Sequence, residues 1–315
     1  MPTNINEFLF NAAGGSGMRL KKATYSSGIN TWIKPAHMTE VAVLVRWLVG
    51  GGGGGGGAGC NAGVNANVLA GGGAGGEVIE NELIIATGNL SCNVGAGGGG
   101  GSIPGSAGLG GGIGGVSTVD TLTARGGGGG ASGYAAVGQT IVYAEPSVVG
   151  MPANTGGGAV SITTLTWPCT GSPGAGAGGH VIQGLGSINN EVQYGAAPEA
   201  PYGHGGHSGA DARINNGTMN LWWPGRGIGR FAWGGNGSVY DHQGFSDAEY
   251  VKKFGGGDGA YIANSMGAAV AVSGGAGQQP GCGGGAAACR GNGMGAVGGN
   301  GAAGFIELWW LESEE

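Results

Sequence analysis

Side chains that could bind a metal ion, catalyse a reaction or bind a ligand gather between residues 202 and 249. His204 and His207 stand two glycines apart, and Asp211 follows close behind them. Imidazole and carboxylate groups are metal ligands, but two histidines on a Gly-Gly spacer are more typical of a solvated or contact loop. The sequence therefore predicts no metal site and no cofactor.

Acidic residues in the same stretch could serve acid/base catalysis. Asp241, His242, Asp247 and Glu249 lie close together, and a carboxylate pair can act on a sugar. An exposed polar turn followed by a helix cap accounts for the same residues, and we favour this interpretation. The sequence contains no GxSxG element and no GxxxxGK[ST] loop, and its GxGxxG matches follow from glycine content alone. We therefore expect a protein that is not an enzyme.

The residues best suited to binding are aromatic. Flat rings flanked by arginine, asparagine and glycine suit sugars or protein loops. The alternative is that these rings form the hydrophobic core of their own stretch, because the glycine-rich parts provide no large side chains. The candidate binding residues are Tyr202, Trp222, Trp223, Arg226, Arg230, Trp233 and Tyr240.

Glycine dominates the parts of the chain on either side of this aromatic cluster, which must hold the cluster in place. The chain has 315 residues, of which 83 are Gly, so a conventional aliphatic core of matching size cannot form. Ordering each Gly costs roughly 0.5 to 1 kcal/mol more than ordering Ala in regular structure. Only 10% of the residues are charged and 40% are apolar, which favours ordered packing over disorder. We expect the glycine runs to pack backbone against backbone, whereas unbroken runs such as 50–57 exclude collagen.

Charge and hydropathy exclude several classes of partner. The net charge is -6 with twelve Lys and Arg spread thinly, so nucleic-acid binding is not expected. We expect no export signal and no membrane insertion, because no basic and apolar leader and no run of 18 apolar residues occur. The five Cys are interpreted as small buried hydrophobes, with a Cys282–Cys289 disulfide as the alternative.

Strands followed by glycine runs recur along the chain. The sequence predicts a short strand with Trp32, a strand over 40–49, a hairpin of 77–86 with 89–94, and a strand within 116–124. The last three of these regions each end in a glycine run. A final strand within 301–312 is expected to pair with 41–49, so that both chain ends lie at one end of the molecule.

The tryptophans of the terminal strands are interpreted as core of this β layer rather than as a ligand platform. They are Trp32, Trp47, Trp309 and Trp310. In polyproline-II conformation an eight-residue glycine run would project about 25 Å from the layer.

Four regions follow from this pattern. Residues 1–23 are expected to be an N-terminal attachment segment. Residues 24–138 and 266–315 are expected to form the first and closing parts of one glycine-rich β domain. Residues 139–265 depart from the glycine pattern and are interpreted as an insertion or second subdomain.

These motifs resemble the glycine-rich domain of bacteriophage tail and appendage proteins. The likeness rests on INTWIKPAHMTEVAVLVRWLVGGGGGGGGAG, NELIIATGNLSCNVGAGGGGGS, LTARGGGGGASG and GGNGAAGFIELWW. It covers 24–135 and 267–312 and leaves the insertion unmatched. The resemblance implies a mainly β fold with extensive irregular glycine-rich structure. In such a fold a small layer of terminal and intervening strands carries glycine segments packed like polyglycine-II helices.

The resemblance also implies a function. A structural virion protein of a tail fibre or tail tip is expected, located in the virion and involved in host attachment and receptor binding. Its partners would be other virion proteins and a host polysaccharide or outer-membrane protein, and a homotrimer is a possible assembly. The alternatives are a capsid spike or decoration protein and, in another class, a tail-borne polysaccharide depolymerase.

Overall fold

The computed structural model describes residues 18–60, 67–102, 110–135, 141–144, 159–162, 169–170, 213–214, 261–262, 270–291 and 293–313. Within these ranges the regular elements are strands in open sheets, and no helix occurs. This confirms the mainly β class. No helix long and apolar enough to cross a membrane is found in these same ranges.

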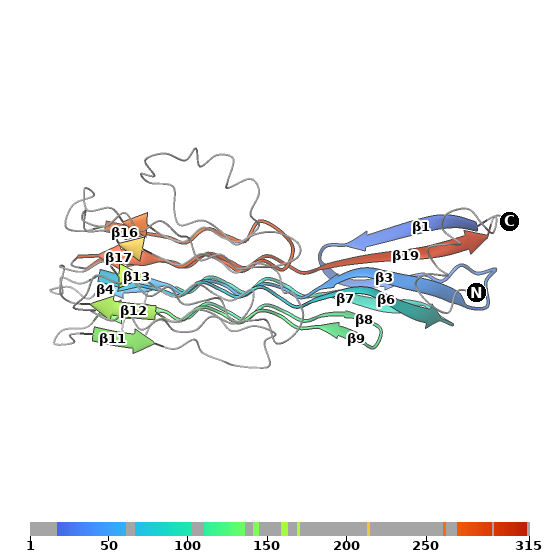
Figure 1. Cartoon of the computed structure of the whole chain (residues 1–315), viewed down its shortest axis with the longest axis horizontal. Coiled ribbons are helices and arrows are strands. Elements are labelled where there is room, and N and C mark those ends of the chain that lie inside the picture. Colours follow the sequence, from blue (N-terminus) through green and yellow to red (C-terminus); the bar gives the residue numbers. More distant parts are fainter. Residues whose placement is uncertain are drawn as a thin grey trace.

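The two ends of the chain meet in one antiparallel sheet. Its strand order is β1-β19-β3-β6. The strands are β1 (Met18–Tyr25), β19 (Phe305–Ser313), β3 (Val41–Val49) and β6 (Val78–Ala86). The predicted pairing of the last strand with 41–49 is confirmed by β19 against β3, and the first and last described residues, Met18 and Ser313, pair with each other (Figure 1). Residues 18–23, expected to belong to an attachment segment, form most of β1.

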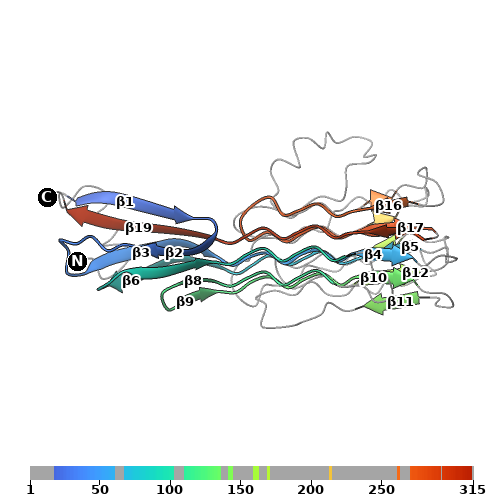
Figure 2. The ribbon, with the colours of Figure 1, turned by 180° about the vertical axis from the view of Figure 1, so that it is seen from behind.

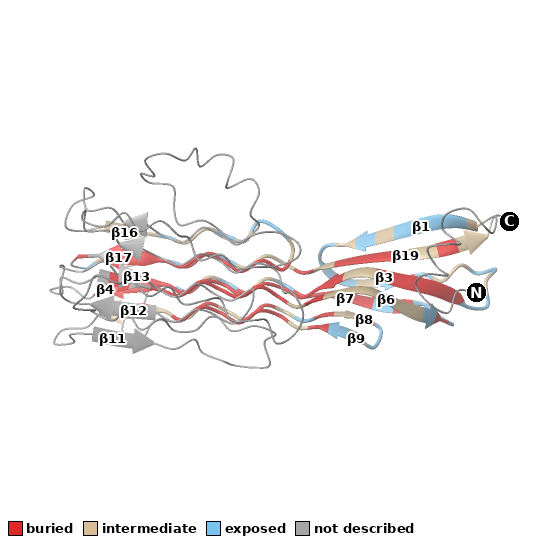
Figure 3. Cartoon of the chain, viewed as in Figure 1, coloured by how far each residue is buried: buried red, intermediate tan, exposed pale blue. Residues whose placement is uncertain are grey.

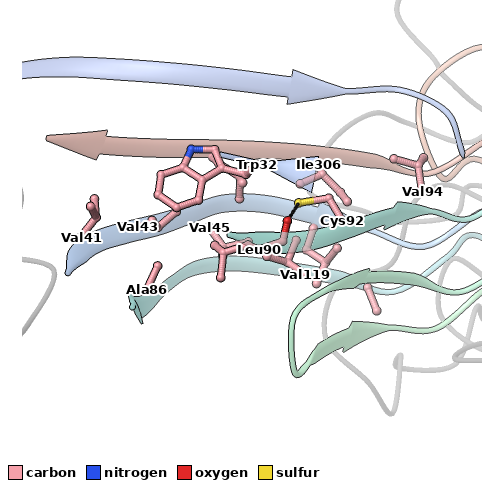
Figure 4. Close-up of a cluster of buried hydrophobic side chains, with 13 residues drawn as sticks. Trp32, Val41, Val43, Val45, Ala86, Leu90, Cys92, Val94, Val119 and Ile306 are labelled. Carbon is pink, nitrogen blue, oxygen red and sulfur yellow. Dashed lines mark hydrogen bonds between the residues drawn. The ribbon is translucent and has the colours of Figure 1, made fainter. Parts of the chain in front are cut away.

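A second antiparallel sheet packs against the first. Its order is β2-β7-β8-β9, and its strands are β2 (Gly28–Trp32), β7 (Leu90–Val94), β8 (Ser117–Val119) and β9 (Leu122–Ala124). Side chains from both sheets form one buried cluster, here called the sandwich core (Figure 4). Its buried members are Trp32, Val41, Val43, Val45, Leu48, Ala86, Leu90, Cys92, Val94, Val119, Ala124, Ile306 and Leu308.

The expected hairpin of 77–86 with 89–94 is wrong. Both strands exist, but β6 pairs with β3, and β7 pairs with β2 and β8. Each strand has an apolar face, and Ala86 and Leu90 contribute to the same core from opposite sheets. Burying both faces against one another requires the chain to cross between the sheets at 87–89. Similarly, the stretch within 116–124 forms two short strands, with Asp120 at a φ of 49° in their turn.

Glycine-rich segments run from the sandwich towards the opposite end of the molecule (Figures 1 and 2). They are residues 50–57, 70–77, 95–102, 110–116, 125–132, 273–280, 281–287 and 297–304, here called the glycine segments. Segment 50–57 is buried along its whole length, as are most residues of 70–77 and 125–132 (Figure 3).

Segment 50–57 is hydrogen-bonded through its N–H groups to three neighbours. Every third N–H group donates to the same neighbouring segment, at N···O distances of 2.8–2.9 Å. The donor–acceptor pairs are Gly50–Glu77, Gly53–Ala74 and Gly56–Gly71, then Gly51–Gly115 and Gly54–Gly112, then Gly52–Ala302 and Gly55–Gly299. The acceptor numbers fall as the donor numbers rise, so these three neighbours run antiparallel to 50–57.

Carbonyl groups of the same segment accept hydrogen bonds from three further neighbours, at 2.7–3.1 Å. The donor–acceptor pairs are Gly127–Gly51, Gly130–Gly54 and Gly133–Gly57, then Gly98–Gly52 and Gly101–Gly55, then Gly284–Gly53 and Ala287–Gly56. Here donor and acceptor numbers rise together, so these neighbours run parallel. Segment 50–57 thus lies at the centre of six others.

The spacing of these segments leaves no room for side chains at the centre. A Cβ atom built on any residue of 50–57 would lie 1.9–2.2 Å from a backbone oxygen of a neighbour. Exposed positions on the peripheral segments recur every third residue instead, at Ala96, Gly99 and Ser102 in one segment and at Val297 and Asn300 in another. Side chains are therefore confined to the outside of the glycine-rich body.

Ser117 connects the sandwich to the glycine segments. Its buried hydroxyl donates to the carbonyl of Val49 at 2.7 Å and accepts from the N–H of Gly95 at 2.9 Å. Val49 and Gly95 are the residues at which the first and third glycine segments leave the sandwich. One polar side chain thus hydrogen-bonds two backbone groups at this junction.

Candidate functional site

The end of the molecule opposite the termini is built from short strands, here called the distal end (Figures 1 and 2). One sheet has the order β10-β4-β18 and another the order β11-β12-β5-β17-β16. The strands at the tips of the glycine segments are β4 (Ala58–Cys60), β5 (Asn67–Leu69), β10 (Gly133–Ala135), β16 (Val270–Val272), β17 (Ala288–Arg290) and β18 (Gly295–Ala296).

A small core of its own holds the distal end together. Its members are mostly Ala and Cys, because strands that continue tightly spaced glycine segments leave space only for short side chains. The buried members are Ala58, Cys60, Val68, Ala70, Ala286, Ala287, Ala288, Cys289 and Ala296. The distal end is thus an ordered platform on which longer connections can be mounted.

The described parts of residues 139–265 all belong to this platform. They are β11 (Ile141–Ala144), β12 (Ala159–Ile162), β13 (Cys169–Thr170), β14 (Arg213–Ile214) and β15 (Tyr261–Ile262). β12 pairs with β5, while β13, β14 and β15 form a three-stranded sheet. β13 and β14 approach β5, and β15 approaches β16 and β17. The insertion therefore departs from and returns to the distal end several times.

The predicted binding residues fall outside the described ranges. This holds for Tyr202, Trp222, Trp223, Arg226, Arg230, Trp233 and Tyr240. The structure neither brings them together nor separates them. What it adds is the position of the nearest described backbone on either side, which is β13 and β14 for Tyr202 and β14 and β15 for the other six residues, all at the distal end.

The candidate metal ligands and carboxylates between His204 and Glu249 also lie outside the described ranges. Within those ranges no group of three His, Cys, Asp or Glu side chains is placed to hold a metal ion.

The cysteines are arranged differently from the alternative considered above. Cys282 lies beside Gly52, near the sandwich, whereas Cys289 lies seven residues further along an extended segment, in the distal core. At about 3.1 Å per residue their Cα atoms are about 22 Å apart, too far for a disulfide. A Cys282–Cys289 disulfide is therefore wrong. Cys60, Cys92, Cys282 and Cys289 are all buried, as the simpler interpretation predicted.

Cys289 instead meets Cys60, a contact that could not be predicted from the sequence because 229 positions separate the two residues. Their sulfur atoms are 3.2 Å apart in the distal core. The hydrogen bond from Cys289 lowers the pKa of the Cys60 thiol, whereas this bond and burial raise the pKa of Cys289. Burial is the main cause that raises the pKa of the Cys92 thiol in the sandwich core.

The tryptophans of the terminal strands divide between the two faces of the first sheet. Trp32 is buried and meets Trp310 edge to face, with ring centroids 5.4 Å apart, as expected for core residues. Trp309 is half-buried on the opposite face, where it packs against a second buried cluster of Ala42, Leu44 and Leu311, so its assignment to the core is confirmed. Trp47 is half-buried and is a member of neither cluster. The Arg46 guanidinium lies 4.5 Å from the ring of Trp47 and 5.8 Å from that of Trp309.

A polar network continues across this outer face of the first sheet. The indole N–H of Trp309 donates to Glu307 at 2.8 Å, and the ammonium of Lys22 lies 3.0 Å from the same carboxylate. Glu307 is itself buried, so this pairing satisfies a charge that would otherwise be costly to bury.

No protein-family model matches the sequence, and comparison with curated proteins finds no significant relative.

Proposed function

We propose that this chain is a structural virion protein of a bacteriophage, a tail fibre or tail tip appendage, that binds a host surface receptor. The sandwich, with both termini, faces other virion proteins. The distal end, with the insertion 139–265, faces the host. The proposal makes the molecule a rod that separates an attachment end from a contact end.

The observation that carries this proposal is the separation of the two ends. The first and last described strands, β1 and β19, belong to the sandwich, whereas every described strand of the insertion lies at the distal end (Figure 1). A chain that must be held by one partner and reach another benefits from such a polarity. The proposal is supported further by the resemblance of the strand-and-glycine motifs to the glycine-rich domain of phage tail proteins.

We also propose that the glycine segments are polyglycine-II helices packed in a hexagonal array. A polyproline-II-type helix has three residues per turn and no internal hydrogen bonds, so its N–H and C=O groups point outwards to neighbours. The hydrogen bonds of segment 50–57 recur every third residue and reach six neighbours, which is the pattern such an array requires. Glycine is needed because a Cβ at the centre would meet backbone oxygen atoms.

Affinity for the receptor would come from the aromatic cluster of the insertion. Trp222, Trp223 and Trp233 offer flat apolar faces with N–H donors, and Arg226 and Arg230 add charge between them. Such surfaces bind sugars or protein loops through stacking and shape.

Binding to whole bacterial cells tests the proposal. Fluorescently labelled protein is expected to bind host cells saturably, and changing Trp222, Trp223 and Trp233 together to Ala is expected to weaken binding by at least about 100-fold. The matched control is Ile29→Ser, a change of an exposed side chain in β2 of the sandwich, which should leave binding unaltered. Thermal unfolding of each variant checks that it remains folded.

Three outcomes would contradict the proposal in different ways. If the intact protein binds no cell type, a capsid spike or decoration role is favoured. If Ile29→Ser weakens binding as much as the triple change, the protein contacts the cell through the sandwich and not through the distal end. If host polysaccharide loses chain length during incubation, and replacing Asp241 and Glu249 stops this loss, the chain is a depolymerase.

A further inference from the structure

We propose that Cys60 and Cys289 form an oxidisable pair that closes a disulfide across the distal end. β4 and β17 bring the two sulfur atoms within 3.2 Å, and both side chains are buried in the distal core. Closing an S–S bond of about 2.05 Å requires the sulfur atoms to approach by only about 1 Å, which side-chain rotation supplies. This inference concerns a covalent modification and does not depend on receptor binding.

The location gives this bond a structural role. Cys60 belongs to the β10-β4-β18 sheet and Cys289 to the β11-β12-β5-β17-β16 sheet, so the bond would join two sheets that otherwise meet through small apolar side chains. Residues 61–288, including the whole insertion, lie within the closed loop. A disulfide here would hold the base from which the insertion departs, whatever the insertion binds.

The two thiols are poised for different steps. The thiolate is the nucleophilic form, and the hydrogen bond from Cys289 favours it at Cys60. Cys60 would attack a peroxide oxygen, giving a sulfenic acid and, after the departing hydroxide takes up a proton, water. The Cys289 sulfur would then attack the Cys60 sulfur, and its proton would leave with the hydroxyl group as a second water. Overall two thiols and one hydrogen peroxide give one disulfide and two waters.

Sequestration of the pair limits other reactions. Buried sulfur atoms are shielded from bulky thiols and disulfides, while hydrogen peroxide is small enough to enter during local opening. A neighbouring thiol captures the sulfenic acid before a second peroxide can oxidise it further. The pair would therefore remain reduced in a reducing cytoplasm and close after release into an oxidising medium.

The test is mass spectrometry of the whole, reduced chain treated with hydrogen peroxide. A loss of about 2 Da and a cross-linked peptide pair containing Cys60 and Cys289 are expected. The thermal unfolding midpoint should rise by on the order of 10 °C and return when a reductant is added. Cys289→Ala should abolish the mass loss, whereas Cys282→Ala, a change of a buried Cys far from the pair, should leave it intact.

Other outcomes would overturn the proposal. Addition of about 16 or 32 Da at Cys60 or Cys289 without the cross-link would mean that the thiols oxidise separately. A cross-link that involves Cys92 or Cys282 would mean that the pairing is wrong. If Cys289→Ala does not fold, the cross-linked peptide of the unaltered chain decides the question by itself.

Discussion

Replacing Gly54 by Ala is expected to destabilise the protein by at least about 3 kcal/mol, enough to remove a large fraction of the stability of an ordinary domain. The added Cβ would lie 2.0 Å from the carbonyl oxygen of Gly99 and 2.5 Å from its carbon. Gly54 also donates to Gly112 and accepts from Gly130, so the backbone cannot move away without breaking these bonds. Urea or thermal unfolding of the purified variant measures the loss.

Gly99→Ala is the matched control. Gly99 belongs to the neighbour that Gly54 would strike, but a Cβ built on Gly99 itself meets no atom within 4 Å. The change should be neutral or should stabilise by about 0.4–1 kcal/mol, because Ala restricts the unfolded chain. Equal effects of the two substitutions would contradict close packing of the glycine segments, because a solvated linker cannot distinguish the two positions.

Trp32→Ala is expected to have the second large effect, costing about 3–5 kcal/mol. Trp32 is the largest fully buried side chain among the residues that the structure describes, and its ring meets Trp310 across the sandwich core. Removing the Trp32 side chain leaves a cavity between the two sheets from which the glycine segments continue. The free energy of unfolding from urea titration is the quantity to compare.

Two further substitutions serve as controls for Trp32→Ala. Ile33→Ala changes the next residue, which is 64% exposed, and should alter stability by no more than about 0.5 kcal/mol. Trp32→Phe keeps most of the ring contact and removes an indole N–H that is buried without a hydrogen-bond partner, so we expect a cost below about 2 kcal/mol. A Trp32→Ala cost as small as that of Ile33→Ala would mean that the sandwich core does not stabilise the molecule.

The strands at the two ends of the chain could be predicted from the sequence because their apolar patterns are strong. The run 41–49 and the final strand each contain enough Val, Leu and Trp to require burial, and pairing them satisfies both. Which face each tryptophan occupies could not be predicted, because β3 and β19 change register beside Glu307. A bulge of this kind shifts the alternation of inward and outward residues.

The strands that pair with 77–86 and 89–94 also could not be predicted from the sequence. A short turn between two strands is typical of a hairpin. Here the chain instead crosses from the first sheet to the second, because both strands bury their apolar faces in the same core. Local pattern does not contain that requirement.

The glycine-rich body has a three-residue periodicity in its sequence that residue composition alone does not reveal. Its exposed positions recur every third residue, and residues other than glycine such as Ala96, Val297 and Asn300 occupy them. A period of three is the repeat of a polyproline-II helix. The six-neighbour arrangement around 50–57, in contrast, depends on the order in which distant segments return, which no local period specifies.

The candidate contact residues remain a sequence-based prediction, since they lie outside the described ranges. The structure contributes the platform beneath them. A distal core of Ala and Cys residues is small, and this is the reason that a covalent bond between Cys60 and Cys289 would matter there. The sandwich, with its large side chains, needs no such bond.

Hydrogen exchange of the central glycine segment would show whether the glycine segments are packed against one another. Seven consecutive residues, 50–56, donate backbone hydrogen bonds to neighbouring segments in the interior of the glycine-rich body. We expect peptides covering 50–57 to exchange slowly, with protection on the order of 10⁴ or more, while the exposed turn at 87–89 exchanges freely. Exchange of 50–57 at the rate of an unstructured glycine peptide would contradict this expectation, because the run would then be a solvated linker and could not hold the two ends apart.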